Sequence, residues 1–153
     1  MEKLNFKIMH TRKEQMEAFG RFLDILDELR EKCPWDSVQT HESLKKYLVE
    51  ESQEVLDGID RLNRTGDSDN LCEELGDVLF QVALHSLIAQ EEGLFTVGDV
   101  ISGVTDKMKF RHPKIFAPED SELCSLSWEA LKAKEQSAKS NSNNNKRAHE
   151  NQM

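Results

Sequence analysis

The chain has 153 residues, of which 37% are hydrophobic and 32% are charged, a balance typical of one soluble domain. Its formal net charge is -9, whereas a general nucleic-acid-binding protein needs a basic surface to neutralise phosphates. This charge does not exclude a nucleotide substrate, because metal ions can mask the negative charge of both protein and substrate.

The cysteines and the first residues indicate the cellular compartment. Cys33, Cys72 and Cys124 lack metal-ligand spacing, and their odd number favours reduced thiols in a cytosolic protein. The start of the chain has no apolar run long enough for a signal peptide or membrane anchor. We therefore predict a cytoplasmic protein with no nucleic-acid or membrane partner.

The first helix is predicted to begin at Thr11, because Glu14 three residues later completes a capping box. Apolar side chains then recur at helical spacing and form a stripe that needs a partner surface. The helix is expected to end near Cys33, since Pro34 disfavours helical conformation in the residue before it.

Three more long helices come next in the predicted order. The second covers residues 40–64, and the third extends from the turn at 65–69 to about residue 92, where Gly93 can serve as its cap. The fourth runs from about Thr96 to about residue 110, and Pro113 stops it.

The last part of the chain is predicted to hold a polar loop, one short helix and a tail. The short helix carries Trp128, Leu131 and Lys134, and residues 137–153 are too polar to form a packed structure. No segment alternates as a strand does. The predicted fold class is therefore all-α, a four-helix-type bundle with a short C-terminal helix, in one domain over residues 11–136.

Two pairs of carboxylates, Glu51 with Glu54 and Glu74 with Asp77, lie on predicted helices at i,i+3 spacing. At about 100° per residue, the first pair falls within the apolar arc of its helix rather than on the polar side. The second pair begins a polar line that continues through Gln81 and His85 along an otherwise apolar helix. Ionised carboxylates in apolar surroundings need a partner that neutralises them.

A hard cation such as Mg²⁺ would satisfy these acids, because it prefers carboxylate oxygens and commonly bridges to phosphates. The alternatives are a buried network with Lys or Arg, or a bundle that buries these positions less than the pattern suggests. No histidine has the spacing from these acids found in iron and zinc sites of helical bundles. His85 is interpreted as a hydrogen-bonded core residue or as a group that orients a carboxylate.

Lys107 and Arg111 share one helix face and could meet a single polyphosphate, although a solvated pair of charges fits the same spacing. Trp128 could anchor a core or stack on a base.

These motifs together resemble the MazG family of all-α nucleoside triphosphate pyrophosphohydrolases. The similarity runs from about Leu29 to about Glu135. It includes Cys33-Pro34-Trp35-Asp36, Gln39 to Leu44, Tyr47 to Val55, Glu73 to Leu79, Ala89 to Phe95, Lys107 to Phe116, and Trp128 to Lys132.

The resemblance implies an enzyme that converts a nucleoside triphosphate into the monophosphate and pyrophosphate with Mg²⁺, for which Mn²⁺ could substitute. It implies a role for each matching residue. The metal ligands are Glu51, Glu54, Glu74 and Asp77; the residues that contact the nucleotide are Tyr47, Asn70, Lys107, Arg111 and Trp128.

Two further acids are candidates for the general base. Glu50 and Glu73 are candidates because they adjoin the metal ligands, although their helix angles point them away from the centre of the cluster. A homodimer is expected, since the apolar helix faces exceed what one small bundle can cover and the family points the same way. The rival interpretations are a relative specific for dUTP, dCTP or phosphoribosyl-ATP, a non-catalytic nucleotide-binding helical dimer, and a plain structural protein.

Overall fold

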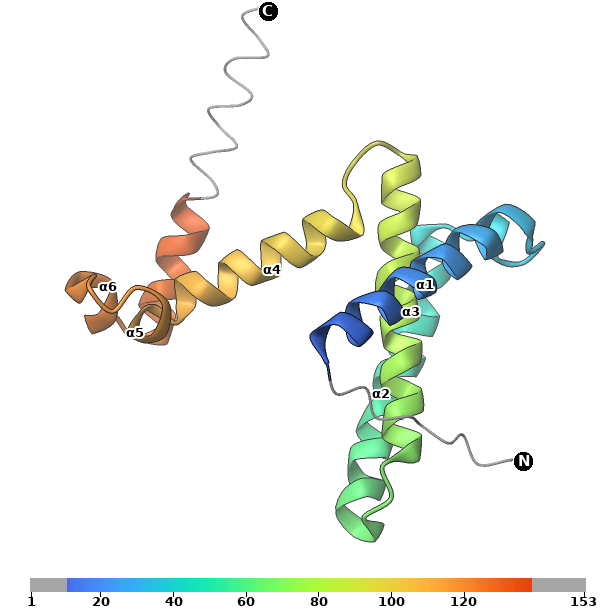
Figure 1. Cartoon of the computed structure of the whole chain (residues 1–153), viewed down its shortest axis with the longest axis horizontal. Helices are drawn as coiled ribbons and strands as arrows, with labels where there is room; N and C mark the ends of the chain where they lie inside the picture. Colours follow the sequence, from blue (N-terminus) through green and yellow to red (C-terminus); the bar gives the residue numbers. More distant parts are fainter. Residues whose placement is uncertain (1–10, 139–153) are drawn as a thin grey trace, which may run out of the picture. The chain divides into compact units, whose positions relative to one another are not determined.

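The computed structural model describes residues 11–138, and all regular elements within them are helical (Figure 1). The four long helices are α1 (Arg12–Lys32), α2 (His41–Thr65), α3 (Asp69–Glu91) and α4 (Val97–Arg111). The shorter ones are the 3₁₀ helix η1 (Asp36–Val38), α5 (Pro113–Phe116), α6 (Ser121–Ser125) and a helix over residues 128–138. The predicted all-α fold class is confirmed.

The chain divides into two compact units, Met1–Val97 and Gly98–Met153, which we call the first and second unit. The first contains α1 to α3, and the second contains nearly all of α4 together with α5, α6 and the helix over residues 128–138. None of the helices in the described part of the chain is long and apolar enough to span a membrane.

Capping interactions place the helix ends within one or two residues of the predicted ones. The side chain of Thr11 accepts a hydrogen bond from the Glu14 amide, and the Glu14 carboxylate accepts one from the Thr11 amide, as the capping box requires. Thr40 caps α2 in the same way. Gly66 ends α2 with a φ of 73° and Gly93 comes directly after α3 and its cap with a φ of 70°, conformations that favour glycine.

The segment between α4 and residue 128 was predicted to be a loop, but it contains two short helices, α5 and α6. Pro113 begins α5, where its fixed φ suits the first helical turn, and the side chain of Asp120 accepts a hydrogen bond from the Leu123 amide at the start of α6. Residues 137 and 138 continue the last helix. The rest of the predicted disordered tail lies outside the described residues.

The core of the first unit forms where α1 crosses the antiparallel pair of α2 and α3 (Figure 1). Its buried members are Leu26 of α1, Leu44 of α2, and Ala83, Leu84 and Ile88 of α3. Phe22, Leu23, Tyr47, Phe80 and Leu87 pack around them and are partly buried. The core therefore lies toward the C-terminal half of α3, which leaves the N-terminal half of that helix free to carry polar groups.

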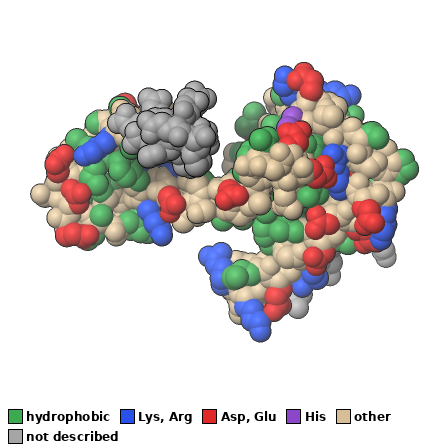
Figure 2. Space-filling model, turned by 90° about the horizontal axis from the view of Figure 1, so that it is seen from above, with side chains coloured by type: hydrophobic (Ala, Val, Ile, Leu, Met, Phe, Trp, Pro, Cys, Tyr) green, Lys and Arg blue, Asp and Glu red, His purple; other side chains and the backbone are tan. Residues whose placement is uncertain are grey.

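Although its sequence is apolar nearly all round, α3 is not buried all round in the chain taken alone. Leu75, Leu79 and Val82 are 52%, 42% and 39% exposed, because α1 and α2 cover only part of the helix circumference. Hydrophobic side chains also reach the surface elsewhere in the molecule (Figure 2). The first unit thus leaves an apolar strip of α3 available to another surface.

Arg30 ties α1 to the connection before α2 and to the end of α3. Its Nη1 donates to the carbonyl oxygens of Asp36 at 2.6 Å and Gln39 at 2.9 Å, while Nε and Nη2 bond the carboxylate of Glu91. Since Asp36 and Gln39 are buried, this side chain satisfies carbonyls that water reaches poorly. It fixes the connection from which α2 begins.

Candidate metal centre

The site depends on a close approach of α2 and α3 at Gly58. A Cβ atom on Gly58 would lie 3.1 Å from the Cα of Leu71 and 3.3 Å from the side-chain oxygen of Asn70. Only glycine therefore fits this crossing without a shift of backbone. The close approach brings the acidic side chains of the two helices together.

Gly58→Ala is expected to destabilise the protein by about 1–3 kcal/mol, because the new methyl group meets the backbone of α3. Gly20→Ala in α1 is the matched control, since a Cβ there meets nothing within 4 Å. The control should be neutral or stabilising by about 0.5–1 kcal/mol through helix propensity. Urea unfolding of both variants measures the difference, and equal stabilities would contradict the close packing.

Three of the four predicted ligands lie together. Carboxylate oxygens of Glu51, Glu54 and Glu74 can be chosen that all lie within 4.8 Å of one another. The first two project from successive turns of α2 and the third from the facing side of α3. The sequence pattern thus predicted the correct neighbours from two separate helices.

Asp77 falls outside this group of three, although its negative charge acts on both Glu51 and Glu74. Burial also differs from the prediction. Glu74 is buried and Glu51 half-buried, whereas Glu54 and Asp77 are exposed. The apolar arcs that contain these acids are only partly covered within one chain, so helical angle alone overestimated their burial.

The arrangement makes the acids hard to ionise together. Burial raises the pKa of Glu74, and a hydrogen bond with the Glu54 carboxyl and the charge of Glu54 raise it further. The Nδ2 group of Asn70, which donates to Glu74 Oε1 at 2.7 Å, opposes this change. Burial likewise raises the pKa of Glu51, with further contributions from the charges of Asp77, Glu54 and Glu50.

These acids fit a divalent cation better than a network of basic side chains. Among the salt bridges that residues 11–138 form with one another, none includes Glu51, Glu54 or Glu74. Three carboxylates close together, without an opposite charge from the described part of the protein, form the oxygen-rich donor set that hard cations select. Occupation by a cation would remove their mutual repulsion.

The raised pKa of Glu74 gives a test in metal-free buffer. Between the ordinary value of 4.5 and the raised folded-state pKa, the native protein binds more protons than the unfolded chain, so its stability falls as pH rises. The Glu74→Gln variant has no carboxyl group at this position, so its stability does not fall with pH for this reason. The stability of the variant relative to the wild type should therefore increase with pH from about 4.5 upward, in urea unfolding with a chelator. A pH-independent difference would contradict the raised pKa.

The other predicted residues of the first unit lie beside the cluster. Glu50 and Glu73 are exposed, in agreement with helix angles that point them away from its centre. Tyr47, one turn before Glu51 on α2, is half-buried and packs edge-on against Trp35 with ring centres 5.5 Å apart. Asn70 contacts the cluster directly through Glu74.

Lys107, Arg111 and Trp128 belong to the second unit. Arg111 forms an ion pair with Glu135 and lies over the Trp128 ring, which also contacts His112 edge-on. Arg111, His112 and Trp128 border a cavity of about 430 Å³ whose lining is mostly apolar and includes Pro113, Ile115, Leu126 and Leu131. Trp128 is exposed, so it is not a fully buried core anchor.

His85 has a hydrogen-bonded partner on α2, His41, to which no sequence pattern points. Their Nδ1 atoms are 2.8 Å apart and the rings are nearly parallel. Burial lowers the pKa of His85, with a smaller contribution from His41. The interpretation of His85 as a hydrogen-bonded residue is confirmed, while its partner could not be identified because 44 residues separate the two.

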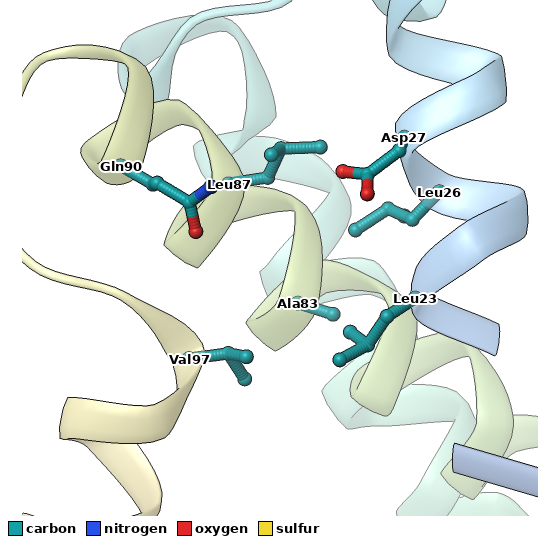
Figure 3. A pocket seen from close by; sticks show the side chains of 7 residues that line it. All are labelled: Leu23, Leu26, Asp27, Ala83, Leu87, Gln90 and Val97. Atoms are coloured by element: carbon teal, nitrogen blue, oxygen red, sulfur yellow. The ribbon is translucent and has the colours of Figure 1, made fainter. Parts of the chain in front are cut away.

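A small cavity elsewhere in the first unit does not compete with the acidic cluster as a nucleotide site. Leu23, Leu26 and Asp27 of α1 face Ala83, Leu87 and Gln90 of α3 across it, and Val97 lies at its edge (Figure 3). Its volume is about 80 Å³, well below the several hundred Å³ of a typical small-molecule site. It is a packing void beside the core.

The chain is similar to known proteins in sequence and in structure. Residues 39–116 match the MazG nucleotide pyrophosphohydrolase domain. The chain is 45% identical over 133 residues to the Thermotoga maritima nucleoside triphosphate pyrophosphohydrolase/pyrophosphatase MazG, covering 85% of this chain and 50% of that protein. It is 41% identical over 130 residues to the Escherichia coli nucleoside triphosphate pyrophosphohydrolase, covering 81% and 48%. It is 44% identical over 129 residues to the uncharacterized Bacillus subtilis protein YabN, covering 81% and 26%.

The solved structure of a mazG-related protein from Thermotoga maritima matches 74% of this chain and 98% of its own, with a TM-score of 0.58 and 29% identity. The chain thus spans half or less of the curated relatives named above, but nearly all of this solved structure. The domain match includes α2, α3 and all four predicted acidic ligands. The chain belongs to the MazG nucleotide pyrophosphohydrolase family.

Proposed function

We propose that this protein hydrolyses nucleoside triphosphates to nucleoside monophosphates and pyrophosphate, with Mg²⁺ as its cofactor. The observation that carries the proposal is the group formed by Glu51, Glu54 and Glu74, whose oxygens converge from two helices without a basic partner in the described protein. Two relatives named pyrophosphohydrolases, each over 40% identical to this chain, support the same reaction.

The acidic residues would hold the cofactor, with Asp77 as the fourth ligand. Bound Mg²⁺ supplies Lewis acidity and neutralises the charge of the triphosphate. Glu74 is oriented by Asn70, so one of the carboxylates is already fixed before substrate binds. Such preorganisation favours catalysis by positioning and charge stabilisation.

The remaining roles rest on the family resemblance and on exposure. Glu50 and Glu73 stay the candidates for the group that takes a proton from the attacking water, because both are exposed acids next to the ligands. Tyr47 and Asn70 would line the nucleotide. Lys107 and Arg111 would contact phosphates, and Trp128 would lie near the nucleotide.

A homodimer is part of this proposal. The exposed apolar strip of Leu75, Leu79 and Val82 lies on the same helix as Glu74, and α2 also exposes Leu48 and Ile59. A second copy of the chain that packed on this strip would bury the exposed face of α3, the helix that carries Glu74. The four-helix-type bundle, the cytoplasmic location and a role in nucleotide sanitation or control remain predictions.

The reaction is tested by incubating the chain with a panel of ribo- and deoxyribonucleoside triphosphates, with and without Mg²⁺, and identifying the products by phosphorus NMR. Monophosphate and pyrophosphate formed only with the metal would support the proposal. Diphosphate and phosphate as products would contradict cleavage between the α- and β-phosphates. Turnover of a single nucleotide would select a specialised relative, and binding without turnover would select the non-catalytic dimer.

A further inference from the structure

Arg111 is held on two sides by neighbours in the second unit. Its Nε donates to Oε2 of Glu135 at 2.7 Å, and its guanidinium carbon lies 5.4 Å from the centre of the Trp128 ring. The side chains of Arg111 and Glu135 are only 15% and 9% exposed. The pair therefore joins the end of α4 to the helix over residues 128–138 in surroundings largely protected from water.

A protected ion pair of this kind contributes little net stability, because removing both charges from water offsets much of their attraction. What it does fix is the direction of a planar group. The guanidinium carries its donors in a rigid fork, and Glu135 takes the Nε donor while Trp128 lies against one face. The contact with Glu135 uses Nε, so the N–H donors of the two Nη atoms can bind another partner.

We propose that Glu135 is a positioning residue, which holds Arg111 by its Nε edge so that its Nη groups are presented to the triphosphate. The inference rests on the proposed function, in which Arg111 contacts phosphates. It adds a residue to which the sequence motifs gave no role. The advantage is preorganisation, because an arginine that is already ordered loses less freedom when it binds an anion.

The test is a double-mutant cycle on nucleotide affinity. Dissociation constants for the α,β-methylene analogue of ATP are measured with Mg²⁺ for Glu135→Gln, Arg111→Ala, the double variant and the wild type. Glu135→Gln keeps the shape of the side chain and removes its charge. We expect it to weaken binding by about 3- to 10-fold, the cost of ordering one long side chain. In the Arg111→Ala background the same change should have no further effect.

The matched control is Glu122→Gln, which removes a second salt bridge that described residues of the second unit form between an acid and a base far apart in sequence. Lys134 and Glu122 are 3.2 Å apart and their side chains are 48% and 81% exposed. This control should bind the analogue within about twofold of the wild type. The inference would be overturned if Glu135→Gln and Glu122→Gln weakened binding equally. It would also be overturned if the effects of Glu135→Gln and Arg111→Ala were additive, since the ion pair would then be purely structural.

A measurement on the unaltered protein covers the case in which Glu135→Gln does not fold. The Nε–H resonance of Arg111, assigned by its loss in Arg111→Lys, is followed by nitrogen-15 NMR as the analogue is added. We expect this resonance to keep its hydrogen-bonded position while the Nη resonances shift. Release of Nε from Glu135 on binding would overturn the inference. If the wild type bound and hydrolysed no nucleotide, the proposed function would fail together with this inference. If the wild type turned over nucleotide and Glu135→Gln bound the analogue as tightly as the wild type, this inference alone would fail.

Discussion

Replacement of Glu74 by glutamine is expected to reduce Mg²⁺-dependent hydrolysis of nucleoside triphosphates by at least ~10²-fold, because it removes a charged ligand and leaves an amide at the centre of the cluster. The substitution keeps the size of the side chain and the possibility of a contact with Asn70. Steady-state kinetics over a range of Mg²⁺ concentrations measure the effect, which should include a higher metal requirement.

The control for this variant is Asp57→Asn, which removes an exposed carboxylate from α2 one turn beyond Glu54. Asp57 lies outside the group of three acids and should leave turnover within about twofold of the wild type. The metal-free Glu74→Gln protein should also be folded and at least as stable as the wild type at neutral pH, since it lacks a buried charge. Full activity of Glu74→Gln would refute the assignment of this residue.

The largest loss of stability is expected from Arg30→Ala. The variant leaves the carbonyls of Asp36 and Gln39 without their donor in a part of the protein that water reaches poorly, and it removes the pair with Glu91. We expect a loss of about 2–4 kcal/mol. For a chain of this size, that corresponds to a decrease in Tm of about 5–15 °C.

Lys32→Ala serves as the comparison for Arg30→Ala. Lys32 pairs with Glu28 on the same helix at 2.7 Å, but both side chains are about 60% exposed, so the pair should contribute less than about 0.5 kcal/mol. Thermal and urea unfolding of the two variants give the difference directly. If they were equally stable, Arg30 would be an ordinary surface residue rather than the link between α1, the connection before α2, and α3.

The helices and the acidic pairs could be predicted because local rules decide them. Thr11, Thr40, Gly66 and Gly93 mark helix ends through hydrogen bonds and backbone angles that involve only a few neighbouring residues. The acids could be assigned to one face because helical angle is set by spacing. Their convergence needed one further assumption, that α2 and α3 pack against each other as an antiparallel pair.

Contacts between distant residues could not be predicted in the same way. Arg30 and Glu91 are separated by 61 residues, and Arg111 and Glu135 by 24, so no local pattern relates them. The exposure of Glu54 and Asp77 likewise depends on how far neighbouring helices extend over them, which periodicity does not specify. The family resemblance supplied the candidate role of Arg111 but not the residue that holds it.

The central claim, that α2 and α3 together hold a divalent cation, is tested most directly by Mn²⁺ titration monitored by electron paramagnetic resonance. Mn²⁺ takes the same oxygen ligands as Mg²⁺ and its free ion gives a strong signal. We predict saturable binding to the wild type, tighter with a non-hydrolysable nucleoside triphosphate, and its loss in Glu54→Gln. Equal Mn²⁺ binding by the wild type and by folded Glu54→Gln would contradict the claim.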